Sequence, residues 1–212
     1  NITDIQSTLD ELAKQTDKRT SVFEIEIQEL KHSSLTLSGR VLDQSQVDNL
    51  HRLFSTHHLD TASISILNAE NHERVHVATN HTGLYEKPTF GVPLSSELYY
   101  GTELEVLDEQ GRWVFTRQTD GYLGWAYRPY LGEGTAPAAS HLVLAPVIEL
   151  RAEPDETSDV VTRIMSGTGV AVEETNDGWS QVQANKSGWL PSIHLRAIND
   201  LPKSLEEKRA AT

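Results

Sequence analysis

Hydrophobic residues change their spacing along the first forty residues, and each spacing is typical of one kind of element. Residues 2–15 carry isoleucine or leucine every three or four positions, which predicts a helix with one apolar face. Residues 23–30 alternate apolar residues with glutamate or glutamine, as a strand with one buried face does. Residues 35–41 alternate in a similar way. The chain is therefore predicted to open with a helix and two strands.

A second helix and a third strand are predicted next. Asp43 or Ser45 can cap a helix that buries one apolar face. Residues 62–67 alternate again and predict a strand. The order α-β-β-α-β across residues 1–80 resembles a BON-type domain, whose core element matches Leu37-Ser38-Gly39-Arg40-Val41 followed by a helix. This resemblance implies an N-terminal α+β domain.

The remainder of the chain contains an internal repeat. Glycine and tryptophan residues of one stretch recur in the same order about sixty-six residues later. The interval shortens by two near the end, as one short deletion in a hairpin loop would cause. The matched pairs are Gly101-Thr102 with Gly167-Thr168, Trp113 with Trp179, Gly124-Trp125 with Gly188-Trp189, and Leu131 with Leu195. The shared order indicates two copies of one fold.

Each copy is built from short strands separated by turns. Alternating apolar residues at 102–107 and 169–173, with Gly-containing turns between strands, predict five strands with a long first loop. This pattern is typical of a small SH3-like β-barrel, one at residues 81–135 and one at 141–198. An Ala- and Pro-rich stretch at 132–140 links them, so we expect the barrels to pack together. The predicted fold is multi-domain and mainly β, with an N-terminal α+β domain and two barrels.

The composition excludes several classes of function. The 212 residues hold 18 Lys and Arg against 31 Asp and Glu, and a net charge of −13 would repel nucleic acid and anionic lipid. Cysteine is absent, which removes thiol catalysis, disulfides and thiolate metal sites. No apolar run approaches the roughly 20 residues of a membrane span. His57-His58 lies near Asp60, but no His-x-x-x-His pair occurs, so we expect neither a metal site nor a cofactor.

The most specific motifs lie in the two copies. Asp120-Gly121-Tyr122-Leu123-Gly124-Trp125 and Leu150-Arg151-Ala152-Glu153-Pro154 resemble the paired bacterial SH3 domains that precede the catalytic domain of NlpC/p60-type cell-wall endopeptidases. Residues 199–212 resemble the linker and first helix that lead into that domain, where the family's Cys nucleophile and His base lie. The resemblance implies that this chain is not itself an enzyme. It also implies a parent cysteine endopeptidase that cleaves peptidoglycan between D-γ-glutamyl and a diamino acid.

The same resemblance implies which residues bind substrate. In the family, the first SH3 domain presents an acidic side chain and a tyrosine to the free amine of the stem peptide, and both groups can satisfy an ammonium. Tyr122 matches the family's tyrosine, Glu86 is the first choice for the acid, and Glu97 is the second. The second copy has Asn185-Lys186-Ser187 at the position of Asp120-Gly121-Tyr122, so we expect it to be structural.

The aromatic residues allow two interpretations. All six tyrosines fall within the first copy, where they can form an amphipathic binding face or pack in the barrel core and between domains. The four tryptophans occupy equivalent positions in the two copies, which favours a shared packing role. The tyrosines are Tyr85, Tyr99, Tyr100, Tyr122, Tyr127 and Tyr130, and the tryptophans are Trp113, Trp125, Trp179 and Trp189.

These patterns predict the non-catalytic targeting and specificity region of a bacterial peptidoglycan endopeptidase, in the cell envelope or secreted. Its expected partners are the stem peptide and the parent's catalytic domain. Two alternatives stay open. One is a stand-alone envelope module that binds a peptide or phospholipid surface. The other is a structural assembly module with a large apolar patch covered by another chain.

Overall fold

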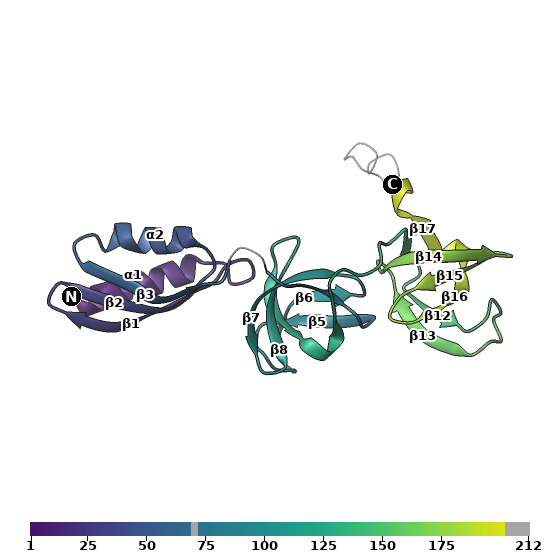
Figure 1. Cartoon of the computed structure of the whole chain (residues 1–212), viewed down its shortest axis with the longest axis horizontal. Coiled ribbons are helices and arrows are strands. Elements are labelled where there is room, and N and C mark those ends of the chain that lie inside the picture. The colour runs from purple at the N-terminus through teal and green to yellow at the C-terminus, as the bar shows by residue number, and fades with distance from the viewer. Residues whose placement is uncertain (69–71, 202–212) are drawn as a thin grey trace.

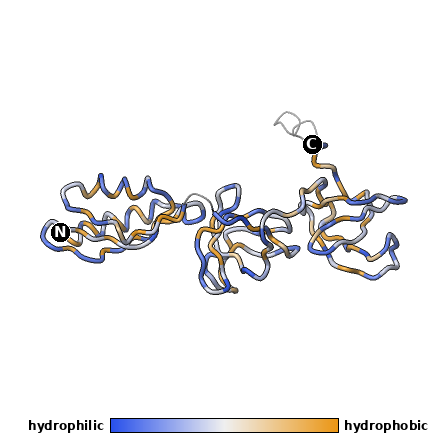
Figure 2. The backbone as a smooth tube through the Cα atoms, in the orientation of Figure 1, coloured by the Kyte–Doolittle hydropathy of each residue, from blue (hydrophilic) through white to orange (hydrophobic). Residues whose placement is uncertain are grey.

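The computed structural model describes residues 1–68 and 72–201, and its three domains follow one another in a row (Figure 1). We call them the N-terminal domain (residues 1–68), the first β-domain (residues 72–135) and the second β-domain (residues 140–201). Hydrophobic and hydrophilic segments alternate along the chain in all three (Figure 2). Each domain therefore has apolar residues with which to build a core of its own.

The N-terminal domain packs two helices against a three-stranded sheet. Its elements follow in the order α1 (Ile2–Gln15), β1 (Phe23–Lys31), β2 (Ser34–Val41), α2 (Gln44–Leu53) and β3 (His58–Ile66). The sheet order is β1-β2-β3, with β1 antiparallel and β3 parallel to β2. This is the order of elements that the periodicity predicts, whereas the likeness to a BON-type domain stays a prediction.

Local chemistry explains where the helices begin. The Asn1 side-chain oxygen accepts hydrogen bonds from the backbone N–H groups of Thr3, at 2.8 Å, and Asp4, at 3.2 Å, which caps α1. Of the two candidate caps for α2, the structure selects Asp43. The Asp43 backbone N–H donates to Gln46 Oε1 at 2.9 Å. Both helix starts are therefore set by residues next to them in the sequence.

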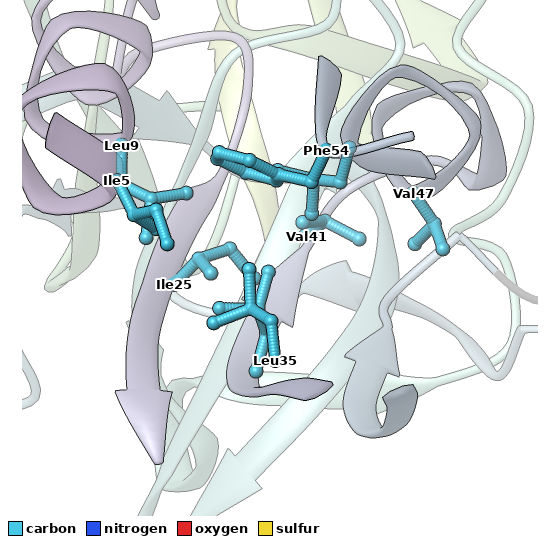
Figure 3. Close-up of a cluster of buried hydrophobic side chains, with 9 residues drawn as sticks. Ile5, Leu9, Ile25, Leu35, Val41, Val47 and Phe54 are labelled. Atoms are coloured by element: carbon cyan, nitrogen blue, oxygen red, sulfur yellow. The ribbon is translucent and has the colours of Figure 1, made fainter. Parts of the chain in front are cut away.

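One core holds the N-terminal domain together. It combines the apolar face of each helix with the inward side chains of β1 and β2 (Figure 3). Its buried members are Ile5, Leu9, Ile25, Leu35, Leu37, Val41, Val47, Leu50 and Phe54. Burying a leucine, isoleucine or phenylalanine side chain contributes about 1.5–3 kcal/mol relative to exposure, so the helices are stabilised mainly by this contact.

The first β-domain is one seven-stranded sheet in the order β10-β4-β7-β8-β9-β5-β6. Its strands are β4 (Arg74–Val77), β5 (His81–Tyr85), β6 (Leu94–Tyr99), β7 (Glu103–Gln110), β8 (Trp113–Gln118), β9 (Leu123–Tyr127) and β10 (Leu131–Glu133). A 3₁₀ turn, Arg128–Tyr130, connects the last two. Strand β4 pairs with β7 and β10 and precedes the predicted start of this unit at residue 81. The sheet therefore begins earlier than the repeat indicates.

The second β-domain repeats this topology strand for strand. Its sheet order is β13-β12-β16-β15-β14-β11-β17. This is the order of the first sheet read from its β6 edge, with each strand replaced by its counterpart. The strands are β11 (His141–Val143), β12 (Val147–Arg151), β13 (Val160–Met165), β14 (Gly169–Asn176), β15 (Trp179–Gln183), β16 (Ser187–Pro191) and β17 (Leu195–Ala197), with 3₁₀ turns at Ser192–His194 and Ile198–Asp200. The structure thus confirms that the sequence repeat encodes two copies of one fold. The helix predicted near the end of residues 199–212 lies outside the described residues.

The prediction of closed barrels is wrong, because both seven-stranded sheets are open. The terminal strands β10 and β6 of the first sheet do not pair with each other, nor do β17 and β13 of the second. Strand β10 has only three residues, and all of them pair with β4. The three residues of β17 likewise pair only with β11. Short edge strands also offer little template for pairing with another chain.

The two β-domains contact each other as expected. Tyr100 of the first is buried in the core cluster of the second, beside Val143 and Leu150. The Asn80 side-chain amide donates to Thr162 Oγ1 at 2.8 Å and to the Arg163 carbonyl at 2.6 Å. Tyr100 thus follows the packing interpretation of the tyrosines rather than the binding one.

Candidate functional site

One face of the first β-domain is lined by aromatic side chains, and we call it the aromatic face. Its residues are Tyr85, Trp113, Phe115, Trp125 and Tyr127. Trp113 pairs with Tyr127 across strands β8 and β9, and Phe115 pairs with Trp125, which in turn pairs with Tyr85. Because alternate residues of a strand point to the same side, these five side chains share one face of the sheet.

The N-terminal domain covers part of the aromatic face. Its side chains Val22, Leu42 and Leu67 form one buried cluster with three residues of the first β-domain, which are Phe115, Leu123 and Trp125. All six are at most 9% exposed. This apolar contact is the main attachment between the two domains, because burial of apolar surface is the dominant favourable term in such contacts.

Three polar contacts fix the orientation of the N-terminal domain on this face. The Leu123 backbone N–H donates to the Arg19 carbonyl at 2.7 Å. Arg40 Nη1 donates to Asp108 Oδ2 at 2.7 Å, and Arg117 Nη2 donates to Asn68 Oδ1 at 3.0 Å. Each contact joins a residue of the N-terminal domain to a strand of the first β-domain, so the two domains have a defined position relative to each other.

The other three rings of the aromatic face lie together with Phe90 and Tyr130, and we call this group of five the aromatic cluster. Tyr85, Phe90, Trp113, Tyr127 and Tyr130 lie with neighbouring ring centroids 4.8–5.5 Å apart, in tilted or edge-to-face arrangements. Phe90 is 49% exposed and Tyr130 40% exposed. Edge-to-face rings attract one another, and exposed tyrosine and tryptophan are typical of binding surfaces. Tyr85, Tyr127 and Tyr130 thus lie together in one group of aromatic rings, and the binding-face interpretation stays a prediction for them.

The second β-domain lacks most of the aromatic rings that form the aromatic face of the first. At the structural positions of Tyr85, Phe115 and Tyr127 it carries Arg151, Gln181 and Pro191, as the matching strand registers show. Only the two tryptophans are kept, Trp179 and Trp189. Without the other rings, this face of the second β-domain is less apolar, and among the described residues no N-terminal domain packs on it.

A groove of about 450 Å³ lies between the N-terminal domain and the first β-domain. Phe115 and Trp125 form part of its apolar lining, and Glu86 of the loop after β5 lines one side. An adjoining cavity of about 190 Å³ shares Phe115, Trp125 and Glu86 with it. Pockets for small ligands span about 300–1,000 Å³, so the groove has the size of a short peptide site. We call it the interdomain groove.

Basic side chains of the N-terminal domain complete the groove. Lys18, Arg19 and Arg40 line it together with Glu24 of strand β1, and Lys87 lines it from the first β-domain. Arg40 binds Glu24 Oε2 at 2.6 Å in addition to Asp108. Burial by itself lowers the pKa of the Arg40 guanidinium, but the hydrogen bonds and charges of these carboxylates hold that pKa above its ordinary value.

Some charges in the groove are already paired, and others are not. Arg19 binds Asp17 at 2.9 Å, and its hydrogen bonds lower the pKa of the Asp17 carboxyl to about 2. Within the part of the chain that the structure describes, Glu86, Lys18 and Lys87 form no ion pair. These three exposed side chains are the charges with which a ligand in the groove can pair.

The structure separates the three residues that the sequence selected for substrate binding. Glu86 lines the interdomain groove. Tyr122 immediately precedes the groove residue Leu123, and its ring packs partly against the core of the first β-domain. Glu97 lies elsewhere, on strand β6, with its carboxylate 3.5 Å from the Tyr99 hydroxyl and 3.8 Å from His81 Nε2. Of the three residues, Glu86 lines the interdomain groove, whereas Tyr122 and Glu97 do not.

Sequence reasoning missed the N-terminal contribution to the groove. Lys18, Arg19 and Arg40 belong to a turn and a strand that show no binding motif, and only the docking of two domains places them opposite Glu86.

Across the described ranges 1–68 and 72–201, no group of three or more His, Cys, Asp or Glu side chains is arranged to hold a metal ion. No helix within those same ranges is long and apolar enough to cross a membrane.

Comparison with known proteins identifies the two β-domains. The family described as bacterial dipeptidyl-peptidase Sh3 domain matches residues 84–126, and the bacterial SH3 domain family matches residues 146–195. No curated protein matches the chain. Both family matches fall within the repeated copies, so the aromatic face and the Glu86 side of the groove belong to a bacterial SH3 domain.

One solved structure has a fold similar to that of this chain. An NlpC/P60 family protein from Bacillus cereus ATCC 10987 is 17% identical, with a TM-score of 0.50, over 65% of this chain and 61% of that one. NlpC1 and NlpC2 from Trichomonas vaginalis are each 14% identical with a TM-score of 0.28, over 65% and 68% of this chain and 50% and 55% of theirs. The chain thus spans about 61% of the length of the Bacillus protein. It is a mainly β chain with two bacterial SH3 domains and a fold similar to that of an NlpC/P60 family protein.

Proposed function

We propose that this chain is the accessory, substrate-selecting region of a bacterial cell-wall hydrolase and that its interdomain groove binds a peptidoglycan stem peptide. Two bacterial SH3 domains and the likeness to an NlpC/P60 family protein support this assignment. In this proposal, hydrolysis is carried out by an NlpC/p60-type domain of the parent protein through a Cys–His pair, and the parent acts in the cell envelope or outside the cell.

The observation that carries the proposal is the position of Glu86. Its carboxylate lines a groove of about 450 Å³ beside Trp125 and forms no ion pair among the described residues. A carboxylate at the side of a partly apolar groove attracts the free ammonium of a short peptide through charge-assisted hydrogen bonds. Tyr122 does not line the groove, but it remains the proposed second partner of that amine. Glu97 remains the second choice for the acid, because it lies on strand β6 outside the groove.

Replacing Glu86 with glutamine tests the proposal. We expect the Glu86→Gln chain to bind the tripeptide L-Ala-γ-D-Glu-diaminopimelate about tenfold more weakly, since a hydrogen bond to a charged group contributes about 1.5–3 kcal/mol. Isothermal titration calorimetry measures the dissociation constant. N-acetylation of the peptide removes the ammonium and is expected to weaken binding to the unmodified chain by a similar factor.

Two control variants sharpen that measurement. Glu156→Gln changes an exposed acid in the corresponding loop of the second β-domain and is expected to leave the affinity unchanged. Glu97→Gln distinguishes the two candidate acids. A loss of affinity in Glu97→Gln but not in Glu86→Gln would move the site to strand β6. Equal binding of the free and N-acetylated peptides would remove amine recognition from the proposal.

The aromatic cluster supports a second candidate, a module that docks on another folded domain. Phe90 and Tyr130 are exposed, and the cluster continues from rings that already seat the N-terminal domain. If it docks on a second copy of this chain, analytical ultracentrifugation will show a mass above that of one chain, and Phe90→Ser will restore the single-chain mass. A single-chain mass at all concentrations would exclude self-assembly through this cluster and leave the parent's catalytic domain as the proposed partner.

A further inference from the structure

The structure assigns to the N-terminal domain a direct part in binding. We infer that Lys18, together with Lys87, binds a carboxylate of the same short peptide whose amine meets Glu86. The site is then built by two domains, and its ligand class is a short peptide that carries a free ammonium and a nearby carboxylate. This inference rests on the proposed function, because it concerns the same interdomain groove.

The position of Lys18 is set by a turn that is anchored at both ends. The backbone N–H groups of Thr20 and Ser21 donate to the Asp17 carbonyl at 3.0 and 2.9 Å, which closes the turn after helix α1. The Arg19 carbonyl accepts from Leu123 of the first β-domain. Lys18 lies between these anchors and lines both the groove and the adjoining cavity. Its backbone is therefore held at the groove although its side chain is exposed.

The charge of the groove differs from that of the whole chain. The chain has 18 basic and 31 acidic residues, yet basic side chains outnumber carboxylates along the groove. Arg40 is neutralised by Glu24 and Asp108, and Arg19 is neutralised by Asp17. The charges left to a ligand are the two lysines, Lys18 and Lys87, and the single carboxylate of Glu86. A ligand with both signs of charge matches this set, whereas a ligand with only an amine leaves the lysines unused.

The dimensions and the apolar lining restrict the ligand further. Trp125 and Phe115 offer apolar contact, and a volume of about 450 Å³ accommodates a few residues. The N-terminal domain walls the groove opposite Glu86, which disfavours a long substituent on the amine. The second β-domain has Ala152 and Glu153 in place of Glu86 and Lys87, so it provides neither the acid nor the lysine.

The test combines two lysine variants with two forms of one peptide, using the full chain. The probes are L-Ala-γ-D-Glu-diaminopimelate and the same peptide with its glutamyl α-carboxylate converted to a carboxamide. We expect Lys18→Gln to weaken binding of the carboxylate form five- to tenfold and to leave binding of the carboxamide form within twofold. Lys87→Gln is expected to act in the same direction. Lys18→Arg keeps the charge and is expected to restore most of the affinity.

Lys14→Gln is the matched control. Lys14 is an exposed lysine in the last turn of helix α1, but it does not line the groove, so its replacement is expected to leave both affinities unchanged. If the unmodified chain and Glu86→Gln both fail to bind the carboxylate form, the proposed function and this inference fall together. If the unmodified chain binds, Glu86→Gln weakens binding and Lys18→Gln does not, only the two-domain site is overturned.

Discussion

Trp125→Ala is expected to release the N-terminal domain from the first β-domain and to lower the free energy of unfolding of that β-domain by about 3–5 kcal/mol. Trp125 is only 7% exposed and packs with Val22, Leu42 and Leu67 of the N-terminal domain. Removing the indole leaves a cavity in the cluster that joins the domains. The remaining contacts, such as Arg40 with Asp108, are partly exposed ion pairs, and such pairs contribute little on their own.

Two measurements separate the effects of Trp125→Ala. Urea unfolding followed by circular dichroism gives the loss of stability, and limited proteolysis between residues 16 and 22 reports release of the N-terminal domain. Trp189→Ala is the matched control, because Trp189 is the repeat equivalent of Trp125, is 8% exposed and has no N-terminal domain packed on it. We expect it to destabilise the second β-domain without exposing residues 16–22. Unchanged proteolysis in Trp125→Ala would show that the polar contacts hold the domains together.

Gly39→Ala is expected to destabilise the N-terminal domain by about 4 kcal/mol, which is the combined scale of backbone strain and steric overlap. Gly39 has φ +131°, a conformation that residues with side chains rarely adopt. A Cβ atom there would lie 1.9 Å from the Glu24 carbonyl oxygen on strand β1. Strand β1 would have to move away from β2, and the core residues Ile25 and Val41 (Figure 3) would lose contact.

Gly121→Ala isolates the backbone-strain part of this effect, and the difference between the two variants gives the steric part. Gly121 also has positive φ, +92°, but no heavy atom lies within 4 Å of a Cβ built there. We expect this variant to cost about 1 kcal/mol, the lower end of the cost of backbone strain alone. Thermal unfolding followed by circular dichroism compares the two variants. Equal losses at both positions would show that backbone strain, and not the close approach of β1 to β2, makes glycine necessary at residue 39.

Gly39 and Arg40 are neighbours in one short motif and have different structural roles. The sequence stretch from Leu37 to Val41 suggested a domain of BON type, and the structure gives a physical role to two of its residues. Gly39 permits the close approach of two strands, and Arg40 joins strand β1 to Asp108 of the first β-domain. A defect at Gly39 is therefore expected to disturb the groove as well as the local core.

Local pattern determined much of the secondary structure, because the period of apolar residues follows directly from which side of an element is buried. The alternation at residues 23–30 predicted a strand, and the structure has one at Phe23–Lys31. The periodicity of residues 2–15 predicted α1. Strand β3 begins at His58, four residues before the predicted start, because its first residues are held by parallel pairing to β2 rather than by their own pattern. The residue at which such a strand begins is therefore decided by its pairing with another strand and not by its own sequence pattern.

The candidate site was predictable only in part. Glu86 was selected from the sequence and lies in the groove, while the cationic side of that groove was not selected. In the sequence, Val22, Leu42 and Leu67 are indistinguishable from core residues of their own domain. Their role in joining two domains depends on which surfaces meet, and residues more than forty positions apart must come together before that contact exists.

The sequence by itself determined that this protein contains two copies of one small β-fold behind an α+β domain, because turns, glycines and alternating apolar residues act over a few positions and are repeated in register. Only the tertiary structure decided that the sheets stay open, that strand β4 joins the first of them, and that the N-terminal domain covers part of an aromatic face. These features depend on long-range pairing and on the burial of apolar surface between domains, which no short stretch of sequence encodes.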